Sequence, residues 1–143
     1  MRVAEILEDK GTRTVTVAKT DPVATAVDLL REEGFGALVV SSDGQTIEGI
    51  ISERDIVRAL GLREDLLDMP VESIMTPHVF TCGPSDQVDS LMSMMTNQRI
   101  RHLPVEVNGM LSGLISIGDV VKHRVSELED EARLVQDYIH HGR

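Results

Sequence analysis

An internal duplication constrains the fold of this chain more than any single motif does. When the sequence is compared with itself at an offset of 65 residues, and of 64 after a one-residue deletion, identical residues recur in the same order. The matching pairs are Thr16 and Thr81, Asp21 and Asp86, Val23 and Val88, Leu38 and Leu103, Val40 and Val105, Gly44 and Gly109, Gly49 and Gly113, Ile51 and Ile115, Ser52 and Ser116, Asp55 and Asp119, and Val57 and Val121. Residues 3–7, at the start of the first repeat, also resemble residues 71–75. We therefore predict two repeats, residues 1–68 and 69–125, followed by residues 126–143.

Each repeat has the same predicted order of elements: strand, helix, strand, strand and helix. In the first repeat, residues 14–17 alternate like a short strand, Asp21-Pro22 predicts a helix start, and Gly34 suits the C-terminal cap of that helix. A turn at residues 41–44, between apolar residues 37–40 and 47–51, predicts a hairpin, and a second helix follows from Glu53. The corresponding segments of the second repeat are residues 79–82, 88–98, 102–107, 111–115 and 117–125.

Two helices per repeat can cover only one face of a three-stranded sheet, so each repeat leaves the other sheet face bare. We therefore predict an α/β (α+β) fold in which two β-α-β-β-α repeats pack sheet to sheet about an approximate two-fold axis. Such a duplication produces two equivalent clefts between the repeats.

Composition and charge disfavour several classes of protein. The formal net charge is −10, and the chain has one Tyr, two Phe and no Trp, which disfavours nucleic acid as a partner. No apolar stretch approaches the roughly 18 residues that span a bilayer, so we expect no membrane segment. The start of the chain lacks the apolar core of a secretion signal and Cys82 is the only cysteine, so we expect a cytoplasmic protein without an internal disulfide.

A seven-residue motif occurs once in each repeat, at the predicted junction between a strand and a helix. It reads Gly-Ile-Ile-Ser-Glu-Arg-Asp at residues 49–55 and Gly-Leu-Ile-Ser-Ile-Gly-Asp at residues 113–119. Ser followed three residues later by Asp is also a helix capping box. The functional alternative is an anion site, because a helix N-terminus offers free N–H groups and a positive dipole end. Ser would then bind phosphate, Asp would accept hydrogen bonds from ribose hydroxyls, and the glycine would allow close approach.

With these tandem motifs, the chain resembles a pair of cystathionine-β-synthase (CBS) domains, the Bateman module, of the stand-alone type. Residues 71–76 (Val-Glu-Ser-Ile-Met-Thr) and 101–105 (Arg-His-Leu-Pro-Val) fit the same family, and the resemblance covers residues 1–125. It implies that adenosine-containing ligands such as AMP, ADP, ATP, NAD(H) or S-adenosylmethionine bind in the clefts between the repeats. Each cleft would combine the first strand and hairpin of one repeat with the Ser-x-x-Asp motif of the other.

Transferred to this sequence, the resemblance predicts the nucleotide-binding residues of both clefts. The first cleft would contain Val15, Phe35, Gly36, Ala37, Leu114, Ser116 and Asp119. The second cleft would contain Phe80, Ile100, Arg101, His102, Ile50, Ser52, Arg54 and Asp55. Apolar members would hold adenine, the aspartates would bind ribose and the serines would bind phosphate. Ordinary core packing is the alternative role for the apolar residues.

The two clefts differ in charge. Arg101, His102 and Arg54 stand where the other repeat has Gly36, Ala37 and Gly118, and all three belong to the second cleft. A polyphosphate needs local positive charge in a chain of net charge −10, so we predict that the second cleft prefers a more phosphorylated ligand or a dinucleotide. The less basic cleft would then take a monophosphate or a nucleoside. The alternative is that Arg99 and Arg101 are surface residues paired with acids such as Glu106.

Other patterns do not support a metal site or catalysis. The five His residues lack metal-ligand spacing, and Cys82 corresponds to strand residue Val17, which favours packing over a nucleophilic role with His102. Phosphate-binding and dinucleotide-binding glycine loops are not found. Met92, Met94 and Met95 suit a helix core. We therefore expect no metal requirement and no catalytic residue.

Residues 126–143 carry an apolar stripe at helical spacing. Leu128, Ala132, Val135 and Ile139 make the stripe, and Ser126 with a glutamate three residues later suits a capping box. This predicts an extra amphipathic helix that packs either on its own module or across a homodimer interface, and we expect a homodimer.

Together these patterns predict a regulatory module that binds adenosine nucleotides and signals to an unknown partner in trans. The alternatives are an enzyme with an unrecognised nucleotide-hydrolysing or transferase site and a structural adaptor whose clefts stay empty.

Overall fold

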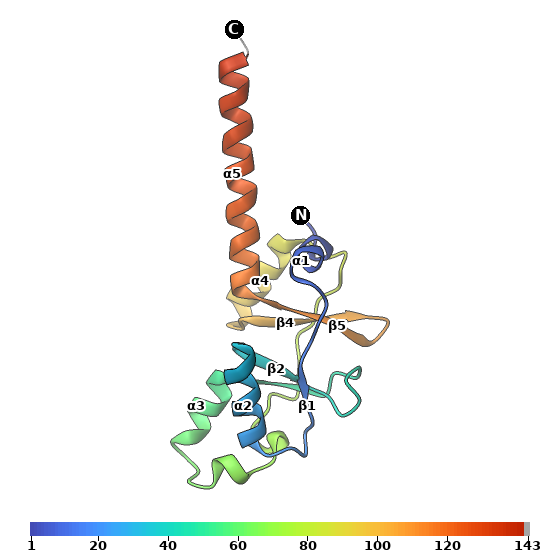
Figure 1. The fold of residues 1–143 in the computed structure, drawn as a ribbon, viewed down its shortest axis with the longest axis vertical. Coiled ribbons are helices and arrows are strands. Elements are labelled where there is room, and N and C mark those ends of the chain that lie inside the picture. The colour runs from blue at the N-terminus through green and yellow to red at the C-terminus, as the bar shows by residue number, and fades with distance from the viewer. Residues whose placement is uncertain (142–143) are drawn as a thin grey trace.

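The computed structural model describes residues 1–141 and has the predicted mixture of helices and sheets (Figure 1). The first sheet has the order β1-β2-β3, with β1 parallel and β3 antiparallel to the central β2, and the second sheet is the antiparallel hairpin β4-β5. The elements are α1 (Val3–Lys10), β1 (Thr16–Val17), α2 (Val23–Glu33), β2 (Ala37–Val40), β3 (Gly49–Ser52), α3 (Glu53–Leu60), the 3₁₀ turns Leu66–Asp68 and Val71–Ser73, α4 (Val88–Gln98), β4 (His102–Val107), β5 (Met110–Ser116) and α5 (Ile117–His141).

The strands predicted at the start of each repeat are short. Of the strand predicted at residues 14–17, only Thr16 and Val17 form a strand, β1. In place of the strand predicted at residues 79–82, the structure has an isolated parallel bridge between Cys82 and Val105. The hairpins are therefore the main sheet element in both repeats.

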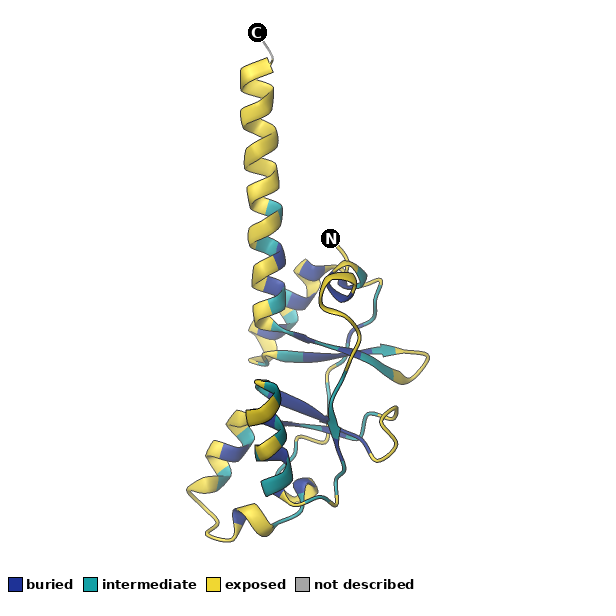
Figure 2. Ribbon diagram, in the orientation of Figure 1, coloured by how far each residue is buried: buried dark blue, intermediate teal, exposed yellow. Residues whose placement is uncertain are grey.

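The two hairpins face each other between outer layers of helices (Figures 1 and 2). Alternation along the strands explains this arrangement, since successive side chains point to opposite faces. Leu38 and Val40 pack with the helices of the first repeat, and Leu103 and Val105 pack in the corresponding core of the second. Val39, between Leu38 and Val40 in β2, points to the opposite face of the sheet. It is also buried but belongs to neither helix-covered core. The fold therefore confirms the predicted α+β class, with hairpins turned toward each other.

Equivalent backbone hydrogen bonds recur in the two halves. The Glu53 N–H donates to the Gly36 carbonyl (3.0 Å), and the Ile117 N–H donates to the Arg101 carbonyl (2.8 Å). Because these four residues occupy matching positions of the duplication, the start of the second helix in each repeat is fixed in the same way.

The segment that precedes each repeat packs on the other repeat. Leu7 and Ile6 of α1 lie in the core of the second repeat with Leu91, whereas Val71 lies in the core of the first repeat with Leu38. Matching bonds hold the two segments: Val3 N–H to Asp86 O (2.9 Å) and Val71 N–H to Asp21 O (2.8 Å). We call these two segments, residues 3–10 and 71–78, the lead-ins. Because each lead-in packs in the core of the other repeat, the two repeats are held together.

One continuous helix, α5, replaces the predicted break at Ser126. It runs from Ile117 to His141, because no glycine or proline after Gly118 interrupts it. It projects from the module in Figure 1, and every residue from Leu128 to His141 is exposed. The alternative in which this segment packs on its own module is therefore wrong for residues 128–141.

Within residues 1–141, none of the helices has the length and apolar character needed to cross a membrane.

Candidate functional site

The two Ser-x-x-Asp motifs form capping boxes at the starts of α3 and α5. In α3 the Asp55 N–H donates to Ser52 Oγ (3.3 Å), and the Ser52 N–H donates to Asp55 Oδ2 (2.9 Å). The bonds between Ser116 and Asp119 are the same, at 3.2 and 2.9 Å. The capping interpretation is thus confirmed in both repeats. The capping bonds use Oδ2 of each aspartate and leave Oδ1 outside the capping box.

The glycine that opens each motif accommodates a lead-in. A Cβ at Gly49 would lie 2.7 Å from Met75 Sδ, and a Cβ at Gly113 would lie 2.8 Å from Leu7 Cδ2. Both distances are shorter than any real contact of such atoms. The opposite lead-in fills the space beside each glycine, so its packing accounts for the glycine without a ligand.

A cavity of about 380 Å³ lies between the repeats, at the first Ser-x-x-Asp motif. All eight residues predicted for the second cleft line it: Phe80, Ile100, Arg101, His102, Ile50, Ser52, Arg54 and Asp55. Hairpin alternation accounts for the strand members, since Ile50, Ser52 and His102 point away from the two helix-covered cores. The structure thus brings together one complete predicted cleft.

The first cleft is not assembled in the same way. Gly36 and Ala37 line the cavity of the second cleft instead, because the His102 ring lies 3.1 Å from the Cβ position of Gly36. Val15 and Phe35 are half-buried and pack against the core of the first repeat, and their role in the first cleft stays a prediction.

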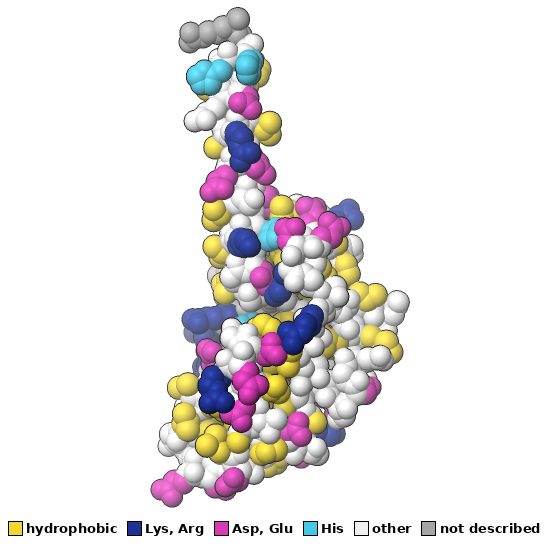
Figure 3. All heavy atoms as spheres, in the orientation of Figure 1, with side chains coloured by type: hydrophobic (Ala, Val, Ile, Leu, Met, Phe, Trp, Pro, Cys, Tyr) yellow, Lys and Arg dark blue, Asp and Glu magenta, His cyan; other side chains and the backbone are white. Residues whose placement is uncertain are grey.

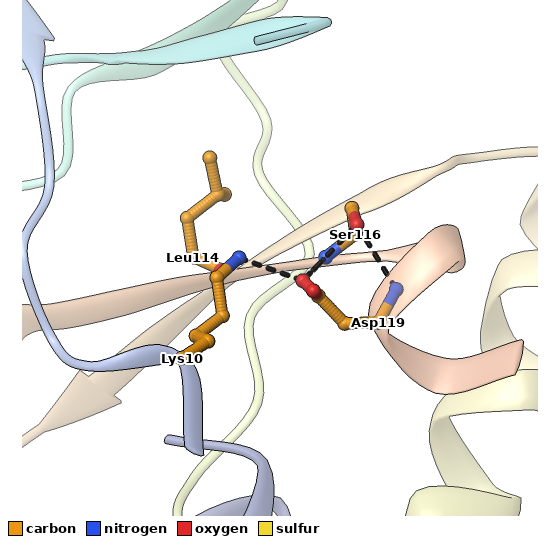
Figure 4. Close-up of polar contacts among 4 residues, drawn as sticks. All are labelled: Lys10, Leu114, Ser116 and Asp119. Atoms are coloured by element: carbon orange, nitrogen blue, oxygen red, sulfur yellow. Dashed lines mark hydrogen bonds and ion pairs between the residues drawn. The ribbon is translucent and has the colours of Figure 1, made fainter. Parts of the chain in front are cut away.

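The other three predicted members, Leu114, Ser116 and Asp119, lie together with Lys10 (Figure 4). Lys10 Nζ donates to Asp119 Oδ2 (2.6 Å) and to the Leu114 carbonyl (2.7 Å). Burial alone would raise the pKa of Asp119, but hydrogen bonds from Lys10 and Ser116 and the charge of Lys10 outweigh it, so that pKa is lowered. The carboxylate of Asp119 is therefore already bound to a cation.

Positive charge gathers at the cavity. Four arginines line it, Arg54, Arg58, Arg99 and Arg101, against two acids, Glu53 and Asp55. Among residues 1–141, none of these arginines forms an ion pair, so the predicted alternative of pairing with Glu106 is not found. Figure 3 shows basic side chains at the level where the two halves meet. In a chain of net charge −10, these arginines make the cavity a locally basic region.

Sequence reasoning missed several lining residues, chiefly Arg58, Thr76 and His78. Arg58 lies one turn after Arg54 on α3, and this spacing was a usable signal. Thr76 and His78 lie at the end of the second lead-in. There the Thr76 hydroxyl approaches Asp55 Oδ1 at 3.4 Å, and the backbones of Thr76 and Ile50 exchange two hydrogen bonds.

Arg99 lines the cavity from a strained backbone position. It caps α4 in the left-handed conformation with φ 54°, where its counterpart Gly34 has φ 69°. A residue with a Cβ costs about 1 kcal/mol there relative to glycine. Its carbonyl accepts a hydrogen bond from Arg54 Nη1 (3.2 Å). The strained arginine thus holds a second arginine at the rim of the cavity.

Two other titratable groups have shifted pKa values. Burial lowers the pKa of His102, with Glu53 opposing and Lys10 adding to the shift, so its ring is neutral near pH 7. Burial, with a contribution from Asp86, raises the pKa of Cys82 to about 12, and its thiol donates to the Pro104 carbonyl (3.7 Å). Cys82 is therefore a packing residue.

Residues 1–141 contain no cluster of three or more His, Cys, Asp or Glu side chains that could hold a metal.

Comparison with known proteins agrees with this geometry. The family model described as CBS domain matches residues 3–62 and 71–126. The mitochondrial CBS domain-containing protein CBSX3 of Arabidopsis thaliana is 33% identical over 149 residues, covering 98% of this chain and 72% of that protein.

Solved structures match in both fold and sequence. The CBS-domain containing protein ATU1752 from Agrobacterium tumefaciens has a TM-score of 0.83 and 41% identity, over 87% of this chain and 99% of that one. The CBS domain protein PAE2072 from Pyrobaculum aerophilum, solved in complex with AMP, has a TM-score of 0.75 and 30% identity, over 83% of this chain and 89% of that one. The chain therefore belongs to the CBS domain family, with one CBS domain in each of its repeats.

Proposed function

We propose that this chain is a regulatory module that binds an adenosine nucleotide in the cavity at Asp55 and signals its presence to a partner protein in trans. The observation that carries the proposal is the convergence of all eight predicted residues of the second cleft on one cavity of about 380 Å³. That volume lies within the usual range for small-molecule sites. The AMP complex of the PAE2072 protein supports the ligand class.

Each part of an adenosine nucleotide has a suitable partner in this cavity. Ile50, Ile100 and the half-exposed Phe80 would pack against adenine. Asp55, whose Oδ1 has no partner among residues 1–141 besides the long contact with Thr76, would accept hydrogen bonds from the ribose hydroxyls. The phosphates would lie at the N-terminus of α3, beside Ser52 and the arginines.

The four arginines favour a ligand with more than one phosphate. A charge-assisted hydrogen bond contributes about 1.5–3 kcal/mol, which is large against the roughly 8 kcal/mol of a micromolar complex. We therefore propose ATP or NAD(H) in preference to AMP at this cavity.

The two pseudo-equivalent aspartates provide a matched test. Asp55→Ala and Asp119→Ala each remove the carboxylate half of a capping box, at a cost of about 1 kcal/mol of stability. Only Asp55 lines the cavity, so calorimetry with AMP, ATP and NADH should show binding lost in Asp55→Ala and kept in Asp119→Ala. Equal binding by both variants would contradict the proposed site.

Signalling requires a partner that distinguishes the liganded form from the free form. The ligand would bridge the two repeats and so bias how the hairpins pack.

The rival proposal of an enzyme predicts turnover when ATP or NADH is incubated with the chain, whereas a binding module leaves the ligand chemically intact. An adaptor with empty clefts predicts no thermal shift with any adenylate. The cytoplasmic location stays a prediction, and the Arabidopsis relative is named mitochondrial.

We also propose a homodimer through α5, because its exposed apolar residues follow a heptad. Val121, Val125, Leu128, Ala132, Val135 and Ile139 are spaced alternately by four and three residues, and all are exposed. This is the seam of a two-stranded coiled coil, in which Arg124 of one copy would face Glu129 of the other in a parallel pair. A second copy is therefore the occupant that fits this face.

A charge placed in the seam tests the dimer. Val135→Lys should give a monomer by light scattering, because it puts a lysine at a core position of the coiled coil. Asp137→Lys, on the opposite side of the same turn, is the control and should leave the mass unchanged. The same mass for both variants would exclude this interface.

A further inference from the structure

We propose that Lys10 is a gate that closes the first cleft to adenosine ligands, so that only the cavity at Asp55 binds a nucleotide in the unmodified chain. The inference rests on the proposed function and deepens it, because it assigns a specificity-determining residue that makes two duplicated clefts unequal.

Three donors already surround one carboxylate oxygen of Asp119. Oδ2 of Asp119 accepts hydrogen bonds from Lys10 Nζ (2.6 Å), the Ser116 N–H (2.9 Å) and the Ser116 hydroxyl (3.0 Å). Lys10 Nζ also donates to the Leu114 carbonyl (2.7 Å). Figure 4 shows the lysine reaching from α1 across strand β5 to the aspartate. All three donors are on Oδ2, so a ribose that reached Oδ1 of the same carboxylate would meet the Lys10 ammonium group beside it.

The path of the lead-in places Lys10 there. Leu7 packs against Gly113, and α1 continues as a helix to Lys10. Lys10 therefore lies one turn beyond the anchor and on the same helix face. Any ligand that enters the first cleft has to move a side chain held by the packing of α1.

The second lead-in has the same anchor but a different continuation. Met75 packs against Gly49 as Leu7 packs against Gly113. Pro77 follows, and because a residue before proline avoids helical backbone, Thr76 is extended and pairs with Ile50. His78, at the position that corresponds to Lys10, lines the cavity, and among residues 1–141 it forms no hydrogen bond or ion pair with Asp55. One proline thus separates an open cleft from a closed one.

A ligand at Asp119 would have to break the ion pair with Lys10. For a pair whose side chains are 37% and 22% exposed, solvent weakens the interaction, and we expect a loss of affinity of about tenfold. The alternative is that Lys10 leaves Asp119 and binds a ligand phosphate. In that case, removing Lys10 would weaken binding and not strengthen it.

Calorimetry on the intact chain distinguishes these roles. Lys10→Met keeps the length of the side chain and removes its charge. Lys19→Met is the matched control, since Lys19 pairs with Glu48 (3.5 Å) on the surface of the first repeat. With AMP and with ATP we expect one site per chain in the wild type and in Lys19→Met. We expect a second site in Lys10→Met, or a weak second site that tightens about tenfold.

A double variant locates the new site. Lys10→Met combined with Asp55→Ala should bind one nucleotide, at Asp119, whereas Asp55→Ala alone should bind none. An unchanged stoichiometry in Lys10→Met, or a weaker site, would overturn the gate while leaving the proposed function intact. An absence of binding in the wild type and in every variant would overturn both. Thermal unfolding of each variant verifies that it is folded.

Discussion

Adding one methyl group at the first glycine of either motif tests the packing of the lead-ins. Gly113→Ala would place Cβ 2.8 Å from Leu7 Cδ2, with other atoms at 3.7 Å or beyond. Gly49→Ala would place Cβ 2.7 Å from Met75 Sδ and also 3.1 Å from the Thr76 carbonyl oxygen. That oxygen is fixed, because it accepts the hydrogen bond of the Ile50 N–H (3.0 Å). The second substitution therefore meets backbone, and the first meets only the end of a side chain.

The magnitudes follow from this difference. Overpacking a core lowers the free energy of unfolding by about 1–3 kcal/mol. Replacing glycine by alanine raises it by about 0.4–1 kcal/mol, because alanine restricts the unfolded chain. We expect a net loss of about 1 kcal/mol for Gly113→Ala, where Leu7 can shift. For Gly49→Ala we expect about 2 kcal/mol, because the backbone pairing of Ile50 with Thr76 has to give way.

Urea unfolding measures both losses, and a double variant adds a stricter test. Leu7→Ala alone should cost about 2–5 kcal/mol through the cavity it leaves. Combined with Gly113→Ala, the new methyl group fills part of that cavity, so the double variant should lose less stability than the sum of the singles. Two neutral glycine variants, or strictly additive losses for Gly113 and Leu7, would refute this account of the motif glycines.

Four further predictions concern the cavity and the core. Arg99→Gly should raise stability by about 1 kcal/mol in urea unfolding, because it relieves left-handed backbone, and should weaken ATP binding in calorimetry; a loss of stability would contradict the assigned strain. Arg101→Ala should weaken ATP and NADH about tenfold and AMP less, and equal small losses would count against the charge argument. The pKa of His102 lies below its usual value of 6.5, so below pH 6.5 the unfolded chain binds a proton that the folded chain does not, and stability should fall as the pH is lowered through that range. His102→Gln should flatten that part of the stability–pH curve, and an unchanged slope would exclude His102 as its source. Cys82, with a pKa of about 12, should react with a thiol reagent at pH 8 only after denaturant is added, and rapid labelling of the folded chain would show that it is accessible.

The duplication explains what the sequence could predict. The turn between the apolar residues 37–40 and 47–51, together with only two predicted helices per repeat, was sufficient to predict two hairpins with their bare faces together. The resemblance to CBS domains, transferred to the repeated motifs, also predicted eight residues that line one cavity.

The features that were missed depend on contacts between distant residues or on ambiguous local signals. No local pattern shows that Leu7 fills the space beside Gly113, more than a hundred residues away. The Ser126 pattern suits a helix interior as well as a cap, so it could not show that α5 is continuous. Pro77 was a usable signal, since it predicts an extended Thr76 in one lead-in and no such break in the other.

A crystal structure of the intact chain grown with ATP tests the central claim most directly. The account predicts nucleotide in the cavity between the repeats, with ribose hydroxyls on Asp55, phosphates among the arginines, and Lys10 still bound to Asp119. An empty cavity at saturating ATP, or a nucleotide seated on Asp119 alone, would contradict it.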